Sequence, residues 1–146
     1  MDKVLSHSFE MIKVGSKSFS GASKLLDKHT RESAILLYSW CRYCDDQIDN
    51  QFLGFNLSFE KVKESDDKIL QKIEKKTHQA INNESLEQFE FEALRRVLEK
   101  HQIPGQYPIE HLEGFRMDVE KKQYHTITDT LDYCYHVAGV VGIMMA

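Results

Sequence analysis

Four side chains between positions 38 and 49 could act together on a phosphate group and a metal ion. They are Tyr38, Arg42, Asp45 and Asp49. Their spacing is i, i+4, i+7 and i+11, so an α-helix would bring them within about 60° of one another on one face. The neighbouring ridge is apolar and would pack into a core. It consists of Leu37, Cys41, Cys44 and Ile48.

The two carboxylates suggest a divalent cation. Asp45 and Asp49 form an i, i+4 pair of like charges, which destabilises an isolated helix by a few tenths of a kcal/mol. A bound cation would remove that repulsion. Mg²⁺ is commonly held by one or two carboxylates together with substrate phosphates, so we expect Mg²⁺ here, with Mn²⁺ as the alternative. Arg42 would take a phosphate oxygen through its planar guanidinium. The competing interpretation is a solvated acidic helix end.

The stretch from Leu37 to Asp49 closely resembles the first aspartate-rich motif of the squalene/phytoene synthase family. Residues 51–55 resemble more specifically the bacterial phytoene synthases of that family. The resemblance implies an all-α fold of the isoprenoid synthase type, a helical bundle around a central cavity. It also implies the Mg²⁺-dependent, head-to-head joining of two isoprenoid diphosphates.

The totals are those of an ordinary globular protein. Of the 146 residues, 41% are hydrophobic and 29% charged, and the net charge is −4. No basic excess suggests a nucleic-acid partner. Two prolines and seven glycines favour long helices. Three cysteines and an N-terminus without an apolar leader predict a reducing, cytoplasmic location. No apolar run could cross a membrane, but apolar substrates leave peripheral membrane contact open.

Hydrophobic periodicity predicts six helices. Their approximate ranges are 3–14, 31–51, 56–78, 85–100, 108–122 and 127–146, with 53–55 ending the second of them. Several residues are expected at helix starts. They are Thr30 as an N-cap, Ser85 with Gln88 as a capping box, Pro108 as a first helical residue, and Thr126 with Asp129 as a final cap.

The segment from Gly15 to Ser20 is rich in hydroxyl groups and carries Lys17. From the residues alone, Ser16 or Ser18 caps a helix, whereas the alternative is a phosphate held by hydroxyls, backbone N–H groups and an ammonium. The family's N-terminal substrate-binding segment resembles Gly15, Ser16, Lys17 and Ser18 followed by the aromatic Phe19. Relatives carry His where this chain has Gly15, so the resemblance implies no side-chain role at that position.

Asp118 is the single acid in the segment Phe115 to Val119. It lies one turn before Lys122, and a surface ion pair between them would contribute well under about 1 kcal/mol. The segment also resembles the family helix that faces the substrate cavity. The resemblance therefore implies a site role for Asp118.

The segment from Tyr133 to Gly142 combines aromatic and small residues. Glycine lowers helix propensity by about 1 kcal/mol against alanine, so the small residues at 138, 139 and 142 need a compensating use. Close helix contact and a groove for a hydrocarbon chain are equally compatible with the spacing. The string resembles a family element in which the residue matching Tyr133 takes part in chemistry. There, small and apolar neighbours line the tail pocket, here Val137, Ala138, Val141 and Gly142.

We expect residues 1–146 to be the N-terminal portion of one all-α prenyl synthase domain, without a second domain. The family's second aspartate-rich motif is absent, so the missing C-terminal half would be needed and the chain alone should be inactive. The implied reaction condenses two geranylgeranyl diphosphates to phytoene, with Tyr133, Arg42, Tyr38 and Asp118 as candidate catalytic residues. The alternatives are a squalene- or dehydrosqualene-type synthase using farnesyl diphosphate, a non-catalytic scaffold relative, and a helical interaction domain.

Overall fold

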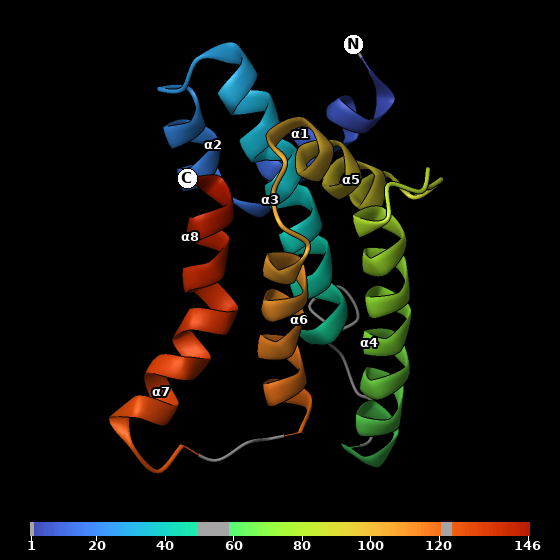
Figure 1. Ribbon diagram of the computed structural model, residues 1–146, viewed down its shortest axis with the longest axis vertical. Helices are drawn as coiled ribbons and strands as arrows, with labels where there is room; N and C mark the ends of the chain where they lie inside the picture. Colours follow the sequence, from blue (N-terminus) through green and yellow to red (C-terminus); the bar gives the residue numbers. More distant parts are fainter. Residues whose placement is uncertain (1, 50–58, 121–123) are drawn as a thin grey trace. The chain divides into compact units, whose positions relative to one another are not determined.

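A computed structural model describes residues 2–49, 59–120 and 124–146 of the chain (Figure 1). Within these ranges every regular element is helical, which confirms the all-α prediction. The helices are α1 (Lys3–Gly15), α2 (Lys17–Ser23), α3 (Lys28–Asp49), α4 (Phe59–Ile81), α5 (Phe89–His101), α6 (Gln106–Val119), α7 (Ile127–Cys134), the π-helical segment η1 (Tyr135–Gly139) and α8 (Val140–Met145). The predicted helix end at 53–55, the motif at 51–55 and Lys122 lie outside the described residues.

The chain forms two compact units. The first comprises Met1–Cys44 and His78–Ile103, and the second comprises Asp45–Thr77 and Pro104–Ala146. No described helix has both the length and the apolar character needed to span a bilayer.

In the first unit α1 packs against α2 and α5. The core contains large apolar side chains that are at most 1% exposed. They include Ile12, Ile35, Leu37, Trp40 and Phe91. A buried hydrogen bond from Ser8 Oγ to Ser39 Oγ, 3.0 Å long, joins α1 to α3. Leu37 and Trp40 thus anchor α3 and turn its polar ridge away from this core.

Two predicted helix starts are wrong. Helix α3 begins at Lys28, because Asp27 Oδ1 accepts the backbone N–H groups of His29 and Thr30 at 3.0 and 3.1 Å. Asp27 rather than Thr30 is therefore the cap. Helix α5 begins at Phe89, beyond the expected Ser85 box, and Gln88 at its N-cap makes no side-chain capping bond.

The other two helix starts are closer to expectation. Helix α6 starts at Gln106, so Pro108 is its third residue rather than its first, within the turn where an N–H has no intrahelical partner. The predicted cap at Thr126 is confirmed, since its Oγ1 accepts the N–H of Asp129 at 3.1 Å.

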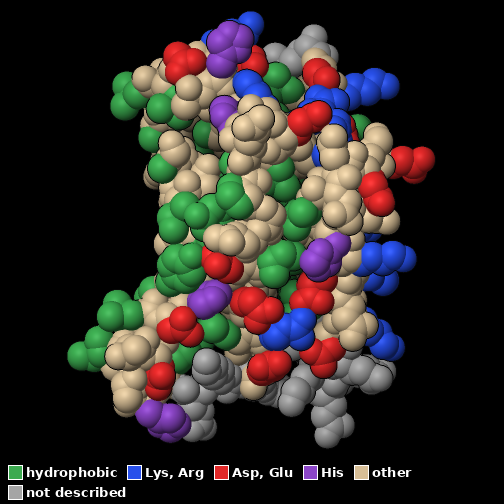
Figure 2. Space-filling view, viewed as in Figure 1, with side chains coloured by type: hydrophobic (Ala, Val, Ile, Leu, Met, Phe, Trp, Pro, Cys, Tyr) green, Lys and Arg blue, Asp and Glu red, His purple; other side chains and the backbone are tan. Residues whose placement is uncertain are grey.

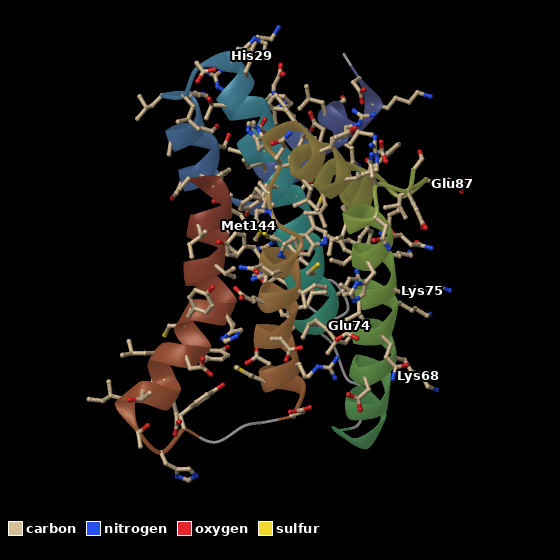
Figure 3. All side chains as sticks on the ribbon, in the orientation of Figure 1. His29, Lys68, Glu74, Lys75, Glu87 and Met144 are labelled. Carbon is tan, nitrogen blue, oxygen red and sulfur yellow. The ribbon has the colours of Figure 1, made fainter. Side chains whose placement is uncertain are left out.

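In the second unit α6 packs against η1, α7 and α8. The three segments α7, η1 and α8 continue one another along one helical rod (Figure 1), so the helix expected over 127–146 is interrupted by a π-helical turn. Helix α4 presents a lysine-rich face to solvent (Figure 2). Lys68 and Lys75 project from that face (Figure 3), while Glu74 forms an ion pair with Arg116 of α6.

Candidate functional site

Three elements of the first unit bring predicted site residues together. The ring of Phe19, from α2, stacks on that of Tyr38, from α3, with centroids 4.7 Å apart and planes inclined by 17°. Gly15, at the end of α1, lies against two of the polar side chains of the α3 ridge, those of Tyr38 and Arg42. A Cβ atom at this glycine would lie 3.5 Å from Tyr38 Oη and 3.6 Å from Arg42 Nε. Gly15, Phe19, Tyr38 and Arg42 thus form one group, which we call the α3 polar group.

The break between α1 and α2 positions Phe19 in this group. Ser16 adopts an extended backbone, with φ −155° and ψ 104°, and its hydroxyl accepts the N–H of Phe19 at 3.2 Å. The capping role predicted for Ser16 is therefore confirmed. Lys17 and Ser18 lie on the exposed side of α2, so their predicted contact with substrate phosphate stays a prediction.

Helix α3 runs without interruption from Lys28 to Asp49. Its helical repeat therefore puts Asp45 one turn beyond Arg42, as the spacing predicted. Asp45 is partly exposed, whereas its neighbour Asp46 is only 4% exposed. Among the side chains that the structure describes, which exclude that of Asp49, no three metal-binding residues cluster.

The donor chemistry at the end of α3 nevertheless suits Mg²⁺. Asp45 offers carboxylate oxygens that solvent reaches, and such oxygens are the ligands that Mg²⁺ prefers. Asp49 follows it at i+4 on the same helix. The pair has the spacing for one cation to bridge, and the assignment of both residues as metal ligands stays a prediction.

In the second unit the structure brings two other predicted site residues into contact. The hydroxyl of Tyr133, on α7, donates to Asp118 Oδ1, on α6, at 2.7 Å. The ring of Tyr124 lies 5.1 Å from that of Tyr133. Asp118 thus has a described partner other than the surface lysine considered from the sequence. A carboxylate that accepts this bond fixes the direction of the phenol oxygen.

Helix α6 also holds the π-helical turn η1, through contacts that were not predicted. His111 is buried, and its Nδ1 donates to the carbonyl oxygen of His136 at 3.1 Å. The hydroxyl of Tyr135 donates to Glu110 Oε2 at 2.5 Å. Gly114 lies so close to η1 that a Cβ atom there would meet Val137 Cγ1 at 2.8 Å. These contacts satisfy and support a backbone segment whose hydrogen-bond pattern departs from the α-helix.

The titration of two side chains reflects these contacts. Burial lowers the pKa of His111, and its bond to the His136 carbonyl offsets part of that effect. The hydrogen bond to Glu110 raises the pKa of Tyr135, because the ionised phenol would face a carboxylate. At neutral pH His111 is therefore an uncharged donor on Nδ1.

Among the residues that the structure describes, Gly139 and Gly142 do not make the close helix contact that was one interpretation of the spacing of the small residues. A Cβ atom at Gly142 would meet nothing within 4 Å, and one at Gly139 would first meet Tyr135 of its own helix, at 3.4 Å. The close contact is made by Gly114 of α6 instead. Ala138 and Gly142 are exposed, and Val141 is partly exposed. Their role in lining a tail pocket, with Val137, stays a prediction.

Sequence reasoning missed the roles of His111, Gly114 and Glu110. The sequence feature that could have indicated them is the i, i+3 spacing of His111 and Gly114. On a helix this spacing places an imidazole ring and a residue without a side chain on the same side. This feature is a weak predictor, because it does not show which segment packs against that side of α6.

Comparison with known proteins places this geometry in context. The family model described as squalene/phytoene synthase matches residues 12–146. The chain is 48% identical over 143 residues to the 15-cis-phytoene synthase of Pantoea ananas, covering 98% of this chain and 46% of that protein. It is 40% identical over 146 residues to the 15-cis-phytoene synthase of a Paracoccus species, covering 100% of this chain and 47% of that protein.

A solved structure shares the fold. The crystal structure of a dehydrosqualene synthase in complex with ligand superposes with a TM-score of 0.82 and 28% sequence identity, over 98% of this chain and 46% of that one. The chain thus spans about half the length of the relatives that it matches. Because the family model covers the aspartate-rich stretch of α3 together with the segments that carry Tyr133 and Asp118, this chain belongs to the squalene/phytoene synthase family.

Proposed function

We propose that this chain binds an isoprenoid diphosphate with Mg²⁺, as part of a synthase that condenses two geranylgeranyl diphosphates to phytoene. The observation that carries the proposal is the α3 polar group, in which Tyr38 and Arg42 meet Gly15 and Phe19. Helix α3 then continues for two turns to Asp45 and Asp49. An ordinary helical interaction domain would have no need for a guanidinium and two carboxylates in this register.

In this proposal Arg42 binds diphosphate oxygens through its planar fork of donors, and Asp45 and Asp49 hold Mg²⁺. When bound, Mg²⁺ neutralises the charge that develops on the departing diphosphate. Breaking the carbon–oxygen bond of one substrate leaves an allylic cation and inorganic diphosphate. The outer faces of the stacked rings of Phe19 and Tyr38 would stabilise such a cation.

Tyr133 and Asp118 are the candidates for proton handling. The hydrogen bond between them holds the phenol in one orientation, so Asp118 acts as a positioning residue for Tyr133. In the intact synthase, Tyr133→Phe and Asp118→Asn should each lower kcat more than they raise KM. The double variant should lose little more than the worse single variant, because both changes remove one unit. Additive losses would contradict this pairing.

A second candidate reaction uses farnesyl diphosphate. It is supported by the likeness to a dehydrosqualene synthase structure, whereas the sequence relatives with 40–48% identity are phytoene synthases. A competition assay with the two diphosphates decides between them. We also propose a cytoplasmic location, in keeping with the cysteines at positions 41, 44 and 134, all within the described residues, which form no disulfide.

The test of the binding proposal compares Arg42→Gln with the wild-type chain. Affinity for a non-hydrolysable geranylgeranyl diphosphate analogue, measured by calorimetry with Mg²⁺ present, should fall at least about tenfold, the effect of losing one charge-assisted contact. A matched control is Arg95→Gln, because Arg95 of α5 is engaged with Glu92 and Glu99. Equal affinity in wild type and Arg42→Gln would contradict the proposal and favour a non-catalytic scaffold.

A further inference from the structure

The π-helical turn η1 separates two parts of the rod that the proposed function uses. Tyr133 lies before the turn, on α7, and the small residues Ala138 and Gly142 lie within it and beyond it. In the turn, the N–H of Val140 bonds to the carbonyl oxygen of Tyr135, five residues earlier. Such turns are rare and occur mostly singly within α-helices, often at functional sites. The contacts that hold η1 therefore bear on the orientation of Tyr133.

Helix α6 lies along this rod and packs against α7, η1 and α8 (Figure 1). Among the α6 residues that contact the rod are His111, Gly114 and Asp118, spaced i, i+3 and i+7. This spacing puts the three on one face of the helix. Asp118 binds Tyr133 before the turn, and the other two contact the turn itself. One face of α6 thus reaches both Tyr133 and η1.

Two side chains of α6 form hydrogen bonds with η1. The hydroxyl of Tyr135 donates to Glu110 Oε2 at 2.5 Å, and His111 Nδ1 donates to the carbonyl oxygen of His136 at 3.1 Å. His111 is only 4% exposed, so little water competes for its bond. Tyr135 and His136 are the first two residues of η1 and follow closely after Tyr133. The two bonds therefore fix the backbone where α7 passes into the turn.

Gly114 allows α6 and η1 to approach closely. It is buried, and a Cβ atom there would lie 2.8 Å from Val137 Cγ1 and 3.1 Å from the backbone of His136. Each residue of an α-helix advances by about 100°, and a π-turn fits more residues into one turn. If η1 rewound as an α-helix while Val137 stayed against Gly114, the side chain of Tyr133 would be turned relative to Asp118. The π-helical form of η1 is thus part of what brings these two residues together.

We propose that Glu110 and His111 are positioning residues for the reaction, because they hold η1 in the form that directs the hydroxyl of Tyr133. This inference rests on the proposed function, in which Tyr133 handles a proton. Asp118 fixes the direction of the phenol, whereas Glu110 and His111 fix the backbone segment next to it. A shift of a reacting group by about 1 Å can lower a rate about a hundredfold, so the support of this segment affects catalysis.

The first test uses the 146-residue chain with ¹³C at the phenol carbon of its tyrosines. Tyr133→Phe identifies the resonance of Tyr133 by its disappearance. This resonance responds to the hydrogen bond of the hydroxyl, so Asp118→Ala marks its position when that bond is lost. We expect Glu110→Ala and His111→Leu each to move the resonance toward that position.

Conservative variants and a control separate positioning from packing. Glu110→Gln keeps an acceptor oxygen and His111→Asn keeps a donor, so both should leave the resonance of Tyr133 near its wild-type position. The matched control is Arg116→Gln, which removes the ion pair of α6 with Glu74 of α4. It should leave the resonance unchanged. Circular dichroism identifies any variant that fails to fold.

The second test measures kinetics in the intact synthase, with kcat expressed per folded molecule. Glu110→Ala and His111→Leu should lower kcat at least about tenfold, with KM changed less than about twofold. Glu110→Gln and His111→Asn should recover most of that loss, and Arg116→Gln should keep the wild-type kcat. In a Tyr133→Phe background, Glu110→Ala should cause little further loss, because both changes act on one unit.

Two results would overturn the inference. The first is a resonance of Tyr133 that stays at its wild-type position in both Glu110→Ala and His111→Leu. The second is an additive loss of kcat when Glu110→Ala is combined with Tyr133→Phe, which would mean that Glu110 acts on the fold in general. Failure of the proposed function looks different, since Tyr133→Phe would then keep the wild-type kcat. That result would also end the positioning role, even if the resonance moved as expected.

Discussion

At the level of single residues, two adjacent acids of α3 differ in what they can bind. Asp45 is partly exposed, while Asp46 is 4% exposed. A hydrated cation with a substrate phosphate can approach Asp45 from solvent, and it would have to displace packed side chains to reach Asp46. We therefore propose that Asp45 and Asp49 bind the metal, whereas Asp46 has a structural position.

Asp45→Asn tests that division. Removing the charge should lower the Mg²⁺-dependent part of the affinity for the diphosphate analogue at least about tenfold, because an amide oxygen is a much weaker ligand for Mg²⁺ than a carboxylate. The melting temperature should hardly change. Calorimetry at saturating Mg²⁺ gives the affinity, and Asp67→Asn on the exposed face of α4 serves as the control. An Asp45→Asn chain that keeps full Mg²⁺-dependent affinity would remove Asp45 from the site.

The residues that the sequence could identify share one helix. The ridge of Tyr38, Arg42 and Asp45 follows from helical repeat alone, and α3 has that repeat. The family resemblance assigned Gly15 and Phe19 to a substrate-binding segment, but it did not predict the approach of Gly15 to Tyr38 and Arg42 or the stacking of Phe19 on Tyr38. The bond between Tyr133 and Asp118 joins α7 to α6, and neither periodicity nor capping rules specify which residues of two helices meet.

At the level of elements, the π-helical turn η1 depends on a helix that is remote from it in sequence. Helix α6 supplies a donor to one of its carbonyl groups, an acceptor for Tyr135 and a space at Gly114. A π-turn inserts an extra residue and so changes the angular relation between the residues before and after it. The contacts of α6 therefore set the angle between Tyr133 and the small residues of α8.

Gly114→Ala should destabilise the chain by up to about 2 kcal/mol. The added methyl group would meet Val137 Cγ1 at 2.8 Å and the backbone of His136 and Val137 at 3.1 Å, which is overpacking, and the alanine's better helix propensity offsets only about 1 kcal/mol. Urea unfolding measures the change. Gly21→Ala on α2, where a Cβ atom meets nothing within 4 Å, should instead be neutral or stabilising. Equal effects at the two glycines would show that α6 does not press on η1.

His111 should make the stability of the chain depend on pH. Its pKa is lowered by burial, so the unfolded state binds a proton more readily than the folded one. The contribution of His111 to the free energy of unfolding is thus fully present above the ordinary histidine pKa of 6.5. It declines as the pH falls below that value, by at most about 1.4 kcal/mol per pH unit.

The variant His111→Asn isolates this effect, because its side-chain amide can donate to the His136 carbonyl from nearly the position of Nδ1 but does not titrate. Urea unfolding at several pH values should show a shallower slope for His111→Asn than for the wild type below 6.5. Identical slopes would contradict a buried, neutral His111.

Helix locations were largely predictable, whereas the residues that start the helices were not. Periodicity predicted the helices of the described ranges apart from the short helix α2, since burying an apolar face is the main stabilising term. Asp27 and Thr30 are both good N-cap residues. Asp27 caps α3 in the structure, and the hydrogen bonds from Arg31 hold the loop that leads to it. The π-turn had no sequence signal, because its stability comes from contacts with α6.

At the level of the whole molecule, ion pairs of the first unit join parts of the chain that are distant in sequence. Glu92 of α5 accepts hydrogen bonds from Arg95 at 2.6 Å and from Arg96 at 3.3 Å. Arg96 also binds Asp2 at 2.7 Å, and Arg95 binds the side chain of Asn83 at 2.8 Å. One carboxylate thus supports contacts that join the N-terminus and the turn after α4 to α5.

Glu92→Gln should lower the free energy of unfolding by about 2 kcal/mol near neutral pH, the typical loss for hydrogen bonds to a charged group. The hydrogen bond from Arg95 lowers the pKa of Glu92, so its contribution is present above the ordinary glutamate pKa of 4.5 and is lost as the pH falls through the folded value. The difference between wild type and variant in urea unfolding should therefore shrink below 4.5. A difference independent of pH would mean that Glu92 acts by packing alone.

We propose that these 146 residues, about half the length of the relatives that the chain matches, contain a binding site for Mg²⁺ and an isoprenoid diphosphate on α3. The most direct measurement is calorimetric titration of the chain with a non-hydrolysable geranylgeranyl diphosphate analogue, with and without Mg²⁺, on a sample whose helicity and thermal melt have been recorded. We expect binding that requires Mg²⁺ and is lost in Arg42→Gln. A folded chain that binds no analogue under either condition would contradict it.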